Sequence, residues 1–151
     1  MASGDPIRVF VTHAWRDSDD YNRVFEFLES ARNFRYLNCS APGRRPASGG
    51  VEVERDELRR QISSAEAVIA VAAMLGQDQA LLHFEMVYAQ SLHRPVLLLP
   101  VFGQALNMPA AFQGLADESL QWDERALVDA LRRQARHEES HRWDTIEFKL
   151  D

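Results

Sequence analysis

The chain has 151 residues and a formal net charge of −6, with 46% apolar and 26% charged residues. This size and balance indicate one globular domain with a sizeable core, and they exclude a disordered chain, a collagen or a small scaffold held by disulfides. The acidic charge makes nucleic acid an unfavourable partner. Because no apolar run approaches the roughly 20 residues that cross a bilayer, no membrane association is expected.

The single cysteine and the N-terminal residues indicate the cellular compartment of the protein. Cys39 is the only cysteine, so it cannot form a disulfide within the chain, which favours a reducing environment. Residues 1–6 are mostly polar and do not resemble a signal peptide. The sequence therefore predicts a cytoplasmic protein.

The first half of the chain alternates short apolar runs with helical patterns. Residues 7–12, Ile-Arg-Val-Phe-Val-Thr, are β-branched and aromatic and predict a strand. Apolar residues at helical spacing predict a helix over 19–31, and a second strand is expected over 34–40. Residues 41–50 contain two prolines and three glycines, which indicate an irregular loop. Helical spacing returns over 53–65.

The second half continues this alternation with more strongly apolar strands, as expected for parallel strands covered on both faces. The expected elements are a strand over 67–74, a helix over 79–93, a strand over 95–101, an irregular segment over 103–114, a strand over 119–122 and a helix over 127–134. The domain is thus predicted to span 1–135. For the charged tail, 136–151, an edge strand at Ile146–Phe148 and partial disorder both stay open.

Alternating strands and helices predict an α/β fold with a mostly parallel sheet. The simplest arrangement is a flavodoxin-like, doubly wound sheet of five strands in the order 2-1-3-4-5. In such sheets ligands bind outside the carboxyl ends of the strands, where the strand order reverses. This point lies between the first and third strands, so residues 13–15, 40–45 and 75–85 are expected to form the rim of a ligand site.

Most familiar catalytic motifs are missing from this rim. There is no Walker sequence, no G-x-G-x-x-G after the first strand, no metal-ligand spacing and no G-x-S-x-G elbow. ATPases, classical dehydrogenases, zinc hydrolases and serine esterases are therefore disfavoured, and no metal is expected. What remains is Glu85, a single acid in an otherwise apolar helix, which is either a solvated face residue or a carboxyl group tuned by burial.

Several other rim residues also have two interpretations. His13 is either a core or capping histidine or a ligand contact, and Trp15 either stacks on a planar ring or covers the end of the sheet. Ser40, with the backbone amides that follow it, suits phosphate oxygens. Arg44 and Arg45 either supply the cation for that phosphate or simply keep the loop soluble.

Several segments resemble TIR-like domains, and the similarity covers roughly residues 7–134. Residues 9–15, Val-Phe-Val-Thr-His-Ala-Trp, resemble the family's first strand and turn, and residues 20–22 and 33–40 resemble one bacterial branch. Residues 84–89, Phe-Glu-Met-Val-Tyr-Ala, followed by residues 94–100, are similar to its W-E-x-x-x-A helix and the next strand.

This resemblance implies cleavage of NAD at the nicotinamide–ribose bond by one glutamate, which corresponds to Glu85. NAD would be the substrate, and no further cofactor is implied. Many bacterial members of the family act in anti-phage defence of the Thoeris kind, in which a cyclic or conjugated ADP-ribose signal activates a separate effector. The expected substrate-binding residues are His13, Ala14, Trp15, Ser40, Arg44, Arg45 and Phe84.

Two other functions stay open. The family often carries a tryptophan where this chain has Leu81, which favours a catalytically inactive TIR-like scaffold or adaptor that acts by self-association. A flavodoxin-like module that binds another nucleotide or a regulator is the third interpretation. A receiver domain is disfavoured, because Thr12 and His13 occupy the place of its acidic cluster and no lysine precedes Lys149.

Overall fold

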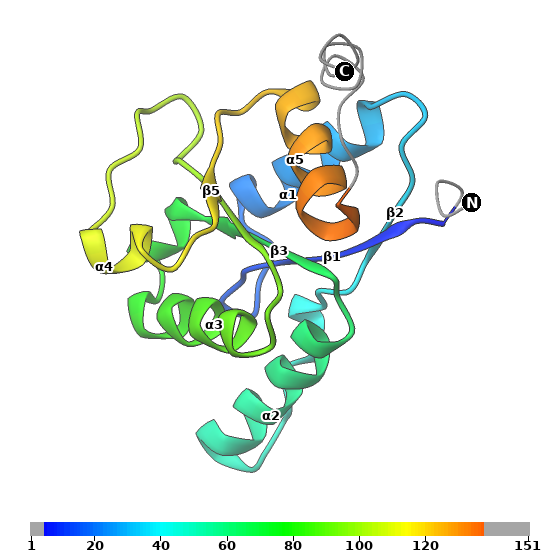
Figure 1. Ribbon diagram of the computed structural model, residues 1–151. Helices are drawn as coiled ribbons and strands as arrows, with labels where there is room; N and C mark the ends of the chain where they lie inside the picture. Colours follow the sequence, from blue (N-terminus) through cyan, green and yellow to red (C-terminus); the bar gives the residue numbers. More distant parts are fainter. Residues whose placement is uncertain (1–4, 138–151) are drawn as a thin grey trace, which may run out of the picture.

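The structure of the chain is a computed structural model that describes residues 5–137. A sheet lies between two pairs of helices, with α1 and α5 on one face and α2 and α3 on the other (Figure 1). The elements are β1 (Ile7–Val11), α1 (Asp19–Ser30), β2 (Tyr36–Asn38), a 3₁₀ helix η2 (Pro42–Arg44), α2 (Gly50–Ser63), β3 (Ala67–Val71), a 3₁₀ helix η3 (Ala72–Gly76), α3 (Gln79–Ser91), β4 (Val96–Leu99), α4 (Ala110–Gln113), β5 (Glu118–Ser119) and α5 (Glu124–Arg136).

The five strands are all parallel, in the order β2-β1-β3-β4-β5, which confirms the predicted α/β fold and its doubly wound topology. Val9 of β1 pairs with Asn38 on one side and with Ala67 on the other. Every residue of β3 and β4 is buried, because helices cover both faces of the central strands. The strand order reverses between β1 and β3, and the candidate site lies at this point.

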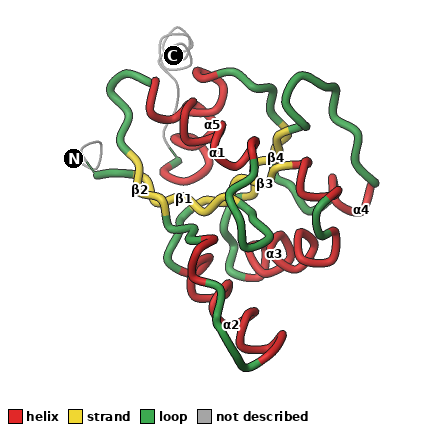
Figure 2. Tube along the Cα trace, turned by 180° about the vertical axis from the view of Figure 1, so that it is seen from behind, coloured by secondary structure: helices red, strands yellow, loops and turns green. Residues whose placement is uncertain are grey.

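Local sequence explains where three of the helices begin. The side chains of Ser18, Asp78 and Asp123 accept hydrogen bonds from the backbone N–H groups of Tyr21, Leu81 and Ala126, respectively. Each therefore satisfies one of the free N–H groups that a helix leaves at its first turn. Helix α2 begins without such a cap, and its N-terminal end stands away from the body of the molecule (Figure 2).

The structure corrects several predicted boundaries. The strand expected over 67–74 ends at Val71, and its last residues form η3, because an apolar run alone does not separate a buried strand from a buried helical turn. The outer strands β2 and β5 are shorter than expected, since each pairs on one side only. The predicted loop over 41–50 contains η2 and already includes the first residue of α2, and α4 lies within the expected irregular segment.

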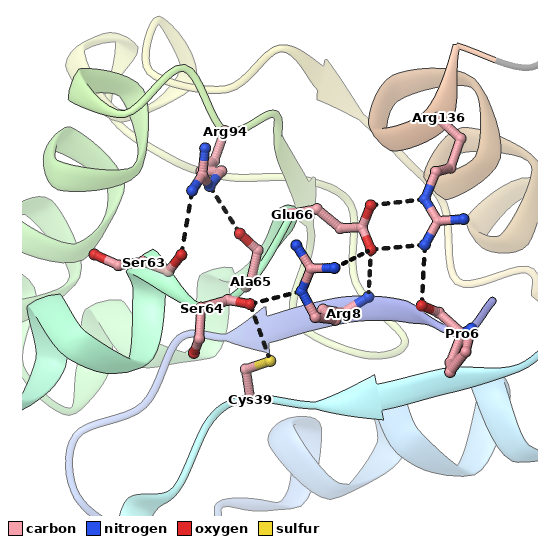
Figure 3. A network of polar contacts seen from close by, with 9 residues as sticks. All are labelled: Pro6, Arg8, Cys39, Ser63, Ser64, Ala65, Glu66, Arg94 and Arg136. Atoms are coloured by element: carbon pink, nitrogen blue, oxygen red, sulfur yellow. Dashed lines mark hydrogen bonds and ion pairs between the residues drawn. The ribbon is translucent and has the colours of Figure 1, made fainter. Parts of the chain in front are cut away.

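Polar contacts tie the turn before β3 to three other parts of the chain (Figure 3). Glu66 accepts hydrogen bonds from the Arg136 guanidinium of α5 at 2.7 and 2.8 Å and from the Arg8 backbone N–H at 2.9 Å. Arg94 donates to the carbonyls of Ser63 and Ala65 at 3.1 and 2.7 Å, and so satisfies acceptors at the end of α2. These contacts lie at the amino ends of β1 and β3, opposite the candidate site.

Two further predictions concern where the domain ends and whether a helix crosses a membrane. The last described helix continues to Arg136, one residue past the predicted domain end, and the proposed edge strand at Ile146–Phe148 lies outside the described residues. Between residues 5 and 137, none of the helices combines the length and the apolar character needed to cross a bilayer.

Candidate functional site

The candidate site begins where β1 ends. The Thr12 backbone N–H donates to the Ile69 carbonyl at 3.0 Å, and the Val71 N–H donates to Thr12 Oγ1 at 3.1 Å. Thr12 therefore stays attached to β3, and the chain turns away only at His13. This turn brings His13 to the carboxyl edge of the sheet, next to helix α3.

Glu85 of α3 lies directly against this turn. Its side chain is fully buried, and its Oε1 accepts a hydrogen bond of 3.0 Å from the His13 backbone N–H. The other oxygen, Oε2, is also buried and has no hydrogen-bond partner among the described residues. Burial raises the pKa of Glu85 well above its usual value, the negative charge of Asp78 raises it further, and the His13 N–H opposes the shift.

The imidazole of His13 is held at both nitrogens. The Trp15 backbone N–H donates to Nδ1 at 3.1 Å, and Nε2 lies 3.0 Å from Gln61 Oε1. Because an amide N–H only donates and an amide oxygen only accepts, this ring is neutral with its proton on Nε2. Burial lowers the pKa of His13 to about 4, which likewise favours the neutral form.

Trp15 adopts a conformation that is rare for an aromatic residue. Its φ angle is 65°, in the left-handed region, and its ring packs edge-on against the His13 imidazole with centroids 5.2 Å apart. The indole Nε1 is buried without a hydrogen-bond partner in the described part of the chain. Strained backbone and unpaired polar atoms are typical of functional sites, since both cost free energy that packing alone does not require.

The segment after β2 is anchored by a ring of hydrogen bonds. Asn38 Nδ2 donates to the Tyr21 hydroxyl at 3.2 Å, Tyr21 and Ser40 share a hydroxyl contact of 2.9 Å, and the Ser40 hydroxyl donates to Asn38 Oδ1. The Ser40 backbone N–H also donates to Asn38 Oδ1 at 2.8 Å. Ser40 therefore fixes the exit of β2 against α1, and its hydroxyl is engaged within the protein in this conformation.

Other predicted contacts lie farther out. Arg44 and Arg45 are exposed and pair with Glu57 at 3.7 Å and with Glu54 at 2.9 Å, on α2. Ala14 is half-buried within the turn after β1.

Phe84 is half-buried on the side of α3 that faces α2. Its ring stacks on Tyr88, and the guanidinium groups of Arg55 and Arg59 lie 4.9 and 5.3 Å from its centroid. The structure brings Glu85, His13 and Trp15 together, but it surrounds Phe84 with these α2 arginines.

Two residues of this cluster were not predicted, Gln61 and Tyr21. Gln61 is buried on α2 and contacts both His13 and Ala41. Its position three residues after Leu58 and four before Ala65 places it on the apolar stripe of the helix, and a polar residue at such a position is a usable signal. Tyr21 carried no comparable signal, since a tyrosine on an apolar stripe is ordinary.

Over residues 5–137, no group of three or more His, Cys, Asp or Glu side chains is placed to hold a metal ion. No model of a known protein family matches the chain, and a search of curated proteins finds no significant match.

Proposed function

We propose that this protein is a TIR-like enzyme that cleaves NAD between nicotinamide and ribose, with Glu85 as the catalytic residue. The observation that carries the proposal is the Glu85 carboxyl group, which is fully buried at the point where the strand order reverses and has one oxygen without a partner among residues 5–137. Ligands of doubly wound sheets bind at this point, and an unpaired buried oxygen costs free energy unless a ligand uses it. The resemblance of the sequence motifs to TIR-like domains is the reason for proposing NAD as that ligand.

The reaction needs a carboxylate more than a proton donor. The bond between C1′ of the ribose and the pyridinium nitrogen breaks, and nicotinamide leaves with the bonding electrons as a neutral molecule. The ribose becomes an oxocarbenium-like cation, which an ionised Glu85 stabilises. Although burial favours the neutral acid in the free protein, the cationic pyridinium of bound NAD favours the carboxylate.

The fate of the cation determines the product. Attack by water gives ADP-ribose and releases one proton, whereas attack by a nitrogen of the substrate's own adenine gives a cyclic product. A site that excludes water once NAD is bound favours the second course. We propose that the cyclic or conjugated ADP-ribose then acts as a signal for a separate effector in anti-phage defence, with self-association of the chain as a further element of its activity.

Substrate access requires a change in the turn after β1. Glu85 has no exposed surface, so NAD reaches it only when a covering segment moves. We propose that Trp15, whose backbone is strained and whose N–H binds the His13 ring, is the part that moves. The indole, whose N–H has no hydrogen-bond partner among the described residues, then becomes available to stack on a ring and to donate a hydrogen bond.

The test is nicotinamide release from NAD by purified protein, followed by chromatography. Glu85→Gln should fold and lose at least about 100-fold in rate, which is the usual cost of removing one electrostatic stabiliser of a transition state. Glu118→Gln is the matched control, because Glu118 is a partly buried glutamate that lies away from the candidate site, on β5, where Arg133 and Gln134 bind it. Equal rates for wild type and Glu85→Gln would refute the assignment.

The complete burial of Glu85 also fits a non-catalytic scaffold in which the carboxyl group only braces the turn. This second function predicts no nicotinamide release by the wild-type protein, alone or assembled, in purified form or with lysate from phage-infected cells. Release that depends on Glu85 excludes it.

A further inference from the structure

Gln61 of α2 connects the two segments that border the candidate site. Its Oε1 accepts from the Ala41 N–H at 2.8 Å and pairs with His13 Nε2 at 3.0 Å. Its Nε2 donates to the Ala41 carbonyl at 3.2 Å and to a Glu57 oxygen at 3.0 Å. Both lone pairs and both N–H groups of the amide are therefore used, although the residue is only 1% exposed.

The orientation of this amide is fixed by its partners. The Ala41 N–H can only donate, while the Ala41 carbonyl and the Glu57 carboxylate can only accept. A flipped amide would place oxygen against oxygen at two of these contacts. Because Oε1 must then face His13, the ring has to present its Nε2–H, and Nδ1 remains free to accept the Trp15 N–H.

The backbone of His13 extends this chain of contacts to the carboxyl group. The ring is held by Gln61, while the N–H of the same residue binds Glu85 Oε1. We propose that Gln61 is a positioning residue: it locks the His13 ring, and thereby directs the His13 N–H at Glu85 while binding the segment after β2 to the turn after β1. Its role in turnover rests on the proposed function, whereas its effect on His13 does not.

The groups around the His13 ring leave Gln61 as its hydrogen-bond acceptor. The Phe10 ring from β1, the Trp15 indole from the turn and the Tyr21 phenol from α1 pack against it through their rings. The two nearest acidic residues bind groups other than the ring. Glu57 accepts a hydrogen bond from Gln61 Nε2, and Glu85 accepts one from the backbone N–H of His13.

The first test needs neither NAD nor turnover. In the wild-type protein at neutral pH, ¹⁵N NMR should show His13 as a neutral ring with its proton on Nε2. A ring protonated on Nδ1, or a charged ring, would overturn the proposal, whatever the variants do.

The second test compares Gln61→Met with Gln134→Met by amide hydrogen exchange. Methionine keeps the length of glutamine but makes none of its four hydrogen bonds. In Gln61→Met the His13 and Ala41 amides should exchange at least about tenfold faster, as expected for the loss of one hydrogen bond, while β3 amides keep their protection. Gln134, half-buried on α5 and bound to Glu118, is the matched control and should change neither. Unchanged exchange at His13 in Gln61→Met would contradict the proposal.

The third test measures turnover. Gln61→Met should lower kcat by about 10- to 100-fold, with a smaller change in KM, because it misplaces a catalytic group rather than removing a substrate contact. If Gln61 acts through the His13 ring, its substitution should have almost no further effect in a His13→Ala background. Independent, multiplying effects would show that Gln61 does not act through His13. A wild-type protein without NAD cleavage would refute the proposed function, while the two NMR tests would still decide the role of Gln61.

Discussion

At the residue scale, two buried titratable groups meet where β1 ends, His13 in the turn and Glu85 on α3, and their pKa values shift in opposite directions. Burial lowers the pKa of the His13 ring to about 4 and raises that of the Glu85 carboxyl group. Both shifts favour the neutral form, since an ionised group loses its hydration when it is buried. Burial therefore disfavours charge on both groups, and a cationic ligand would change this balance most strongly at Glu85.

The first prediction concerns the stability of Glu85→Gln. Because the folded state holds the Glu85 proton more tightly than the unfolded chain does, the contribution of this residue to stability falls as pH rises above the unfolded value, 4.5, towards the folded pKa. Glutamine has no such loss. The variant should therefore gain stability relative to wild type as pH rises from 5 to 8, measured by urea unfolding at a series of pH values. A difference that stays constant with pH would contradict the assigned burial.

The second prediction concerns His13 and acid. The folded state resists protonation of this ring, so its contribution is fully present above the unfolded value of 6.5 and is lost as pH falls towards about 4. The loss over this interval should be about 3 kcal/mol, measured as the pH dependence of the unfolding free energy. His13→Gln should flatten this part of the curve. An equally steep curve in the variant would assign the acid sensitivity to other groups.

At the element scale, the structure depends on a few residues at the ends of helices and strands. Helix α2 starts at Gly50, directly after Gly49, whose φ angle is 105°. A β-carbon on Gly49 would lie 2.5 Å from Val53 Cγ2, so this glycine is required both by its backbone conformation and by the close approach of the helix. The orientation of α2 in turn determines where Gln61 meets His13.

The third prediction is that Gly49→Ala destabilises the protein by about 1–3 kcal/mol, from the strained φ angle and the contact with Val53. Gly43→Ala is the control, because a β-carbon there meets nothing within 4 Å. Thermal unfolding of both variants gives the comparison. Equal melting temperatures for the two would show that the start of α2 rearranges at little cost.

The presence and the order of the helices and strands were easier to predict than the residues at which they begin and end. The alternation of apolar runs and helical spacing was sufficient for the five-stranded parallel sheet in the order observed. The end of β3 at Val71 was not predictable in this way, because Ala72 and Met74 are as buried as the strand itself. Burial there comes from packing around η3, which periodicity in the sequence does not reveal.

At the scale of the whole molecule, the two edges of the sheet differ in character. At the amino ends of β1 and β3, Glu66 is paired with Arg136 and with the Arg8 N–H. At the carboxyl edge, Trp15 is strained and one oxygen of Glu85 has no hydrogen-bond partner in the described part of the chain. This contrast agrees with the proposed function, because a site that binds and releases a ligand cannot have all of its polar groups satisfied without that ligand.

The fourth prediction tests this division with Glu66→Gln. The Arg136 guanidinium is the largest cause of the lowered pKa of Glu66, with further contributions from the backbone N–H and charge of Arg8, so the pair stabilises the fold above the usual carboxyl pKa and loses this effect as pH falls through the folded value. The variant should lose about 1–3 kcal/mol at pH 7 in urea unfolding. Its nicotinamide release per folded molecule should equal that of wild type. A loss of release without a loss of stability would show that the two edges are coupled.

Periodicity, turn residues and the apolar strands of this sequence were enough for the fold class and the strand order, since these follow from which faces must be buried. The strand order in turn gave the place of the candidate site, which stays a prediction. Placing Glu85 on this rim also required only the sequence. Its contact with the His13 N–H, the neutral His13 ring and the part played by Gln61 were decided by tertiary structure alone. Gln61 and Glu85 lie 48 and 72 positions after His13, respectively. Hydrogen bonds over such separations depend on how α2 and α3 pack against the sheet.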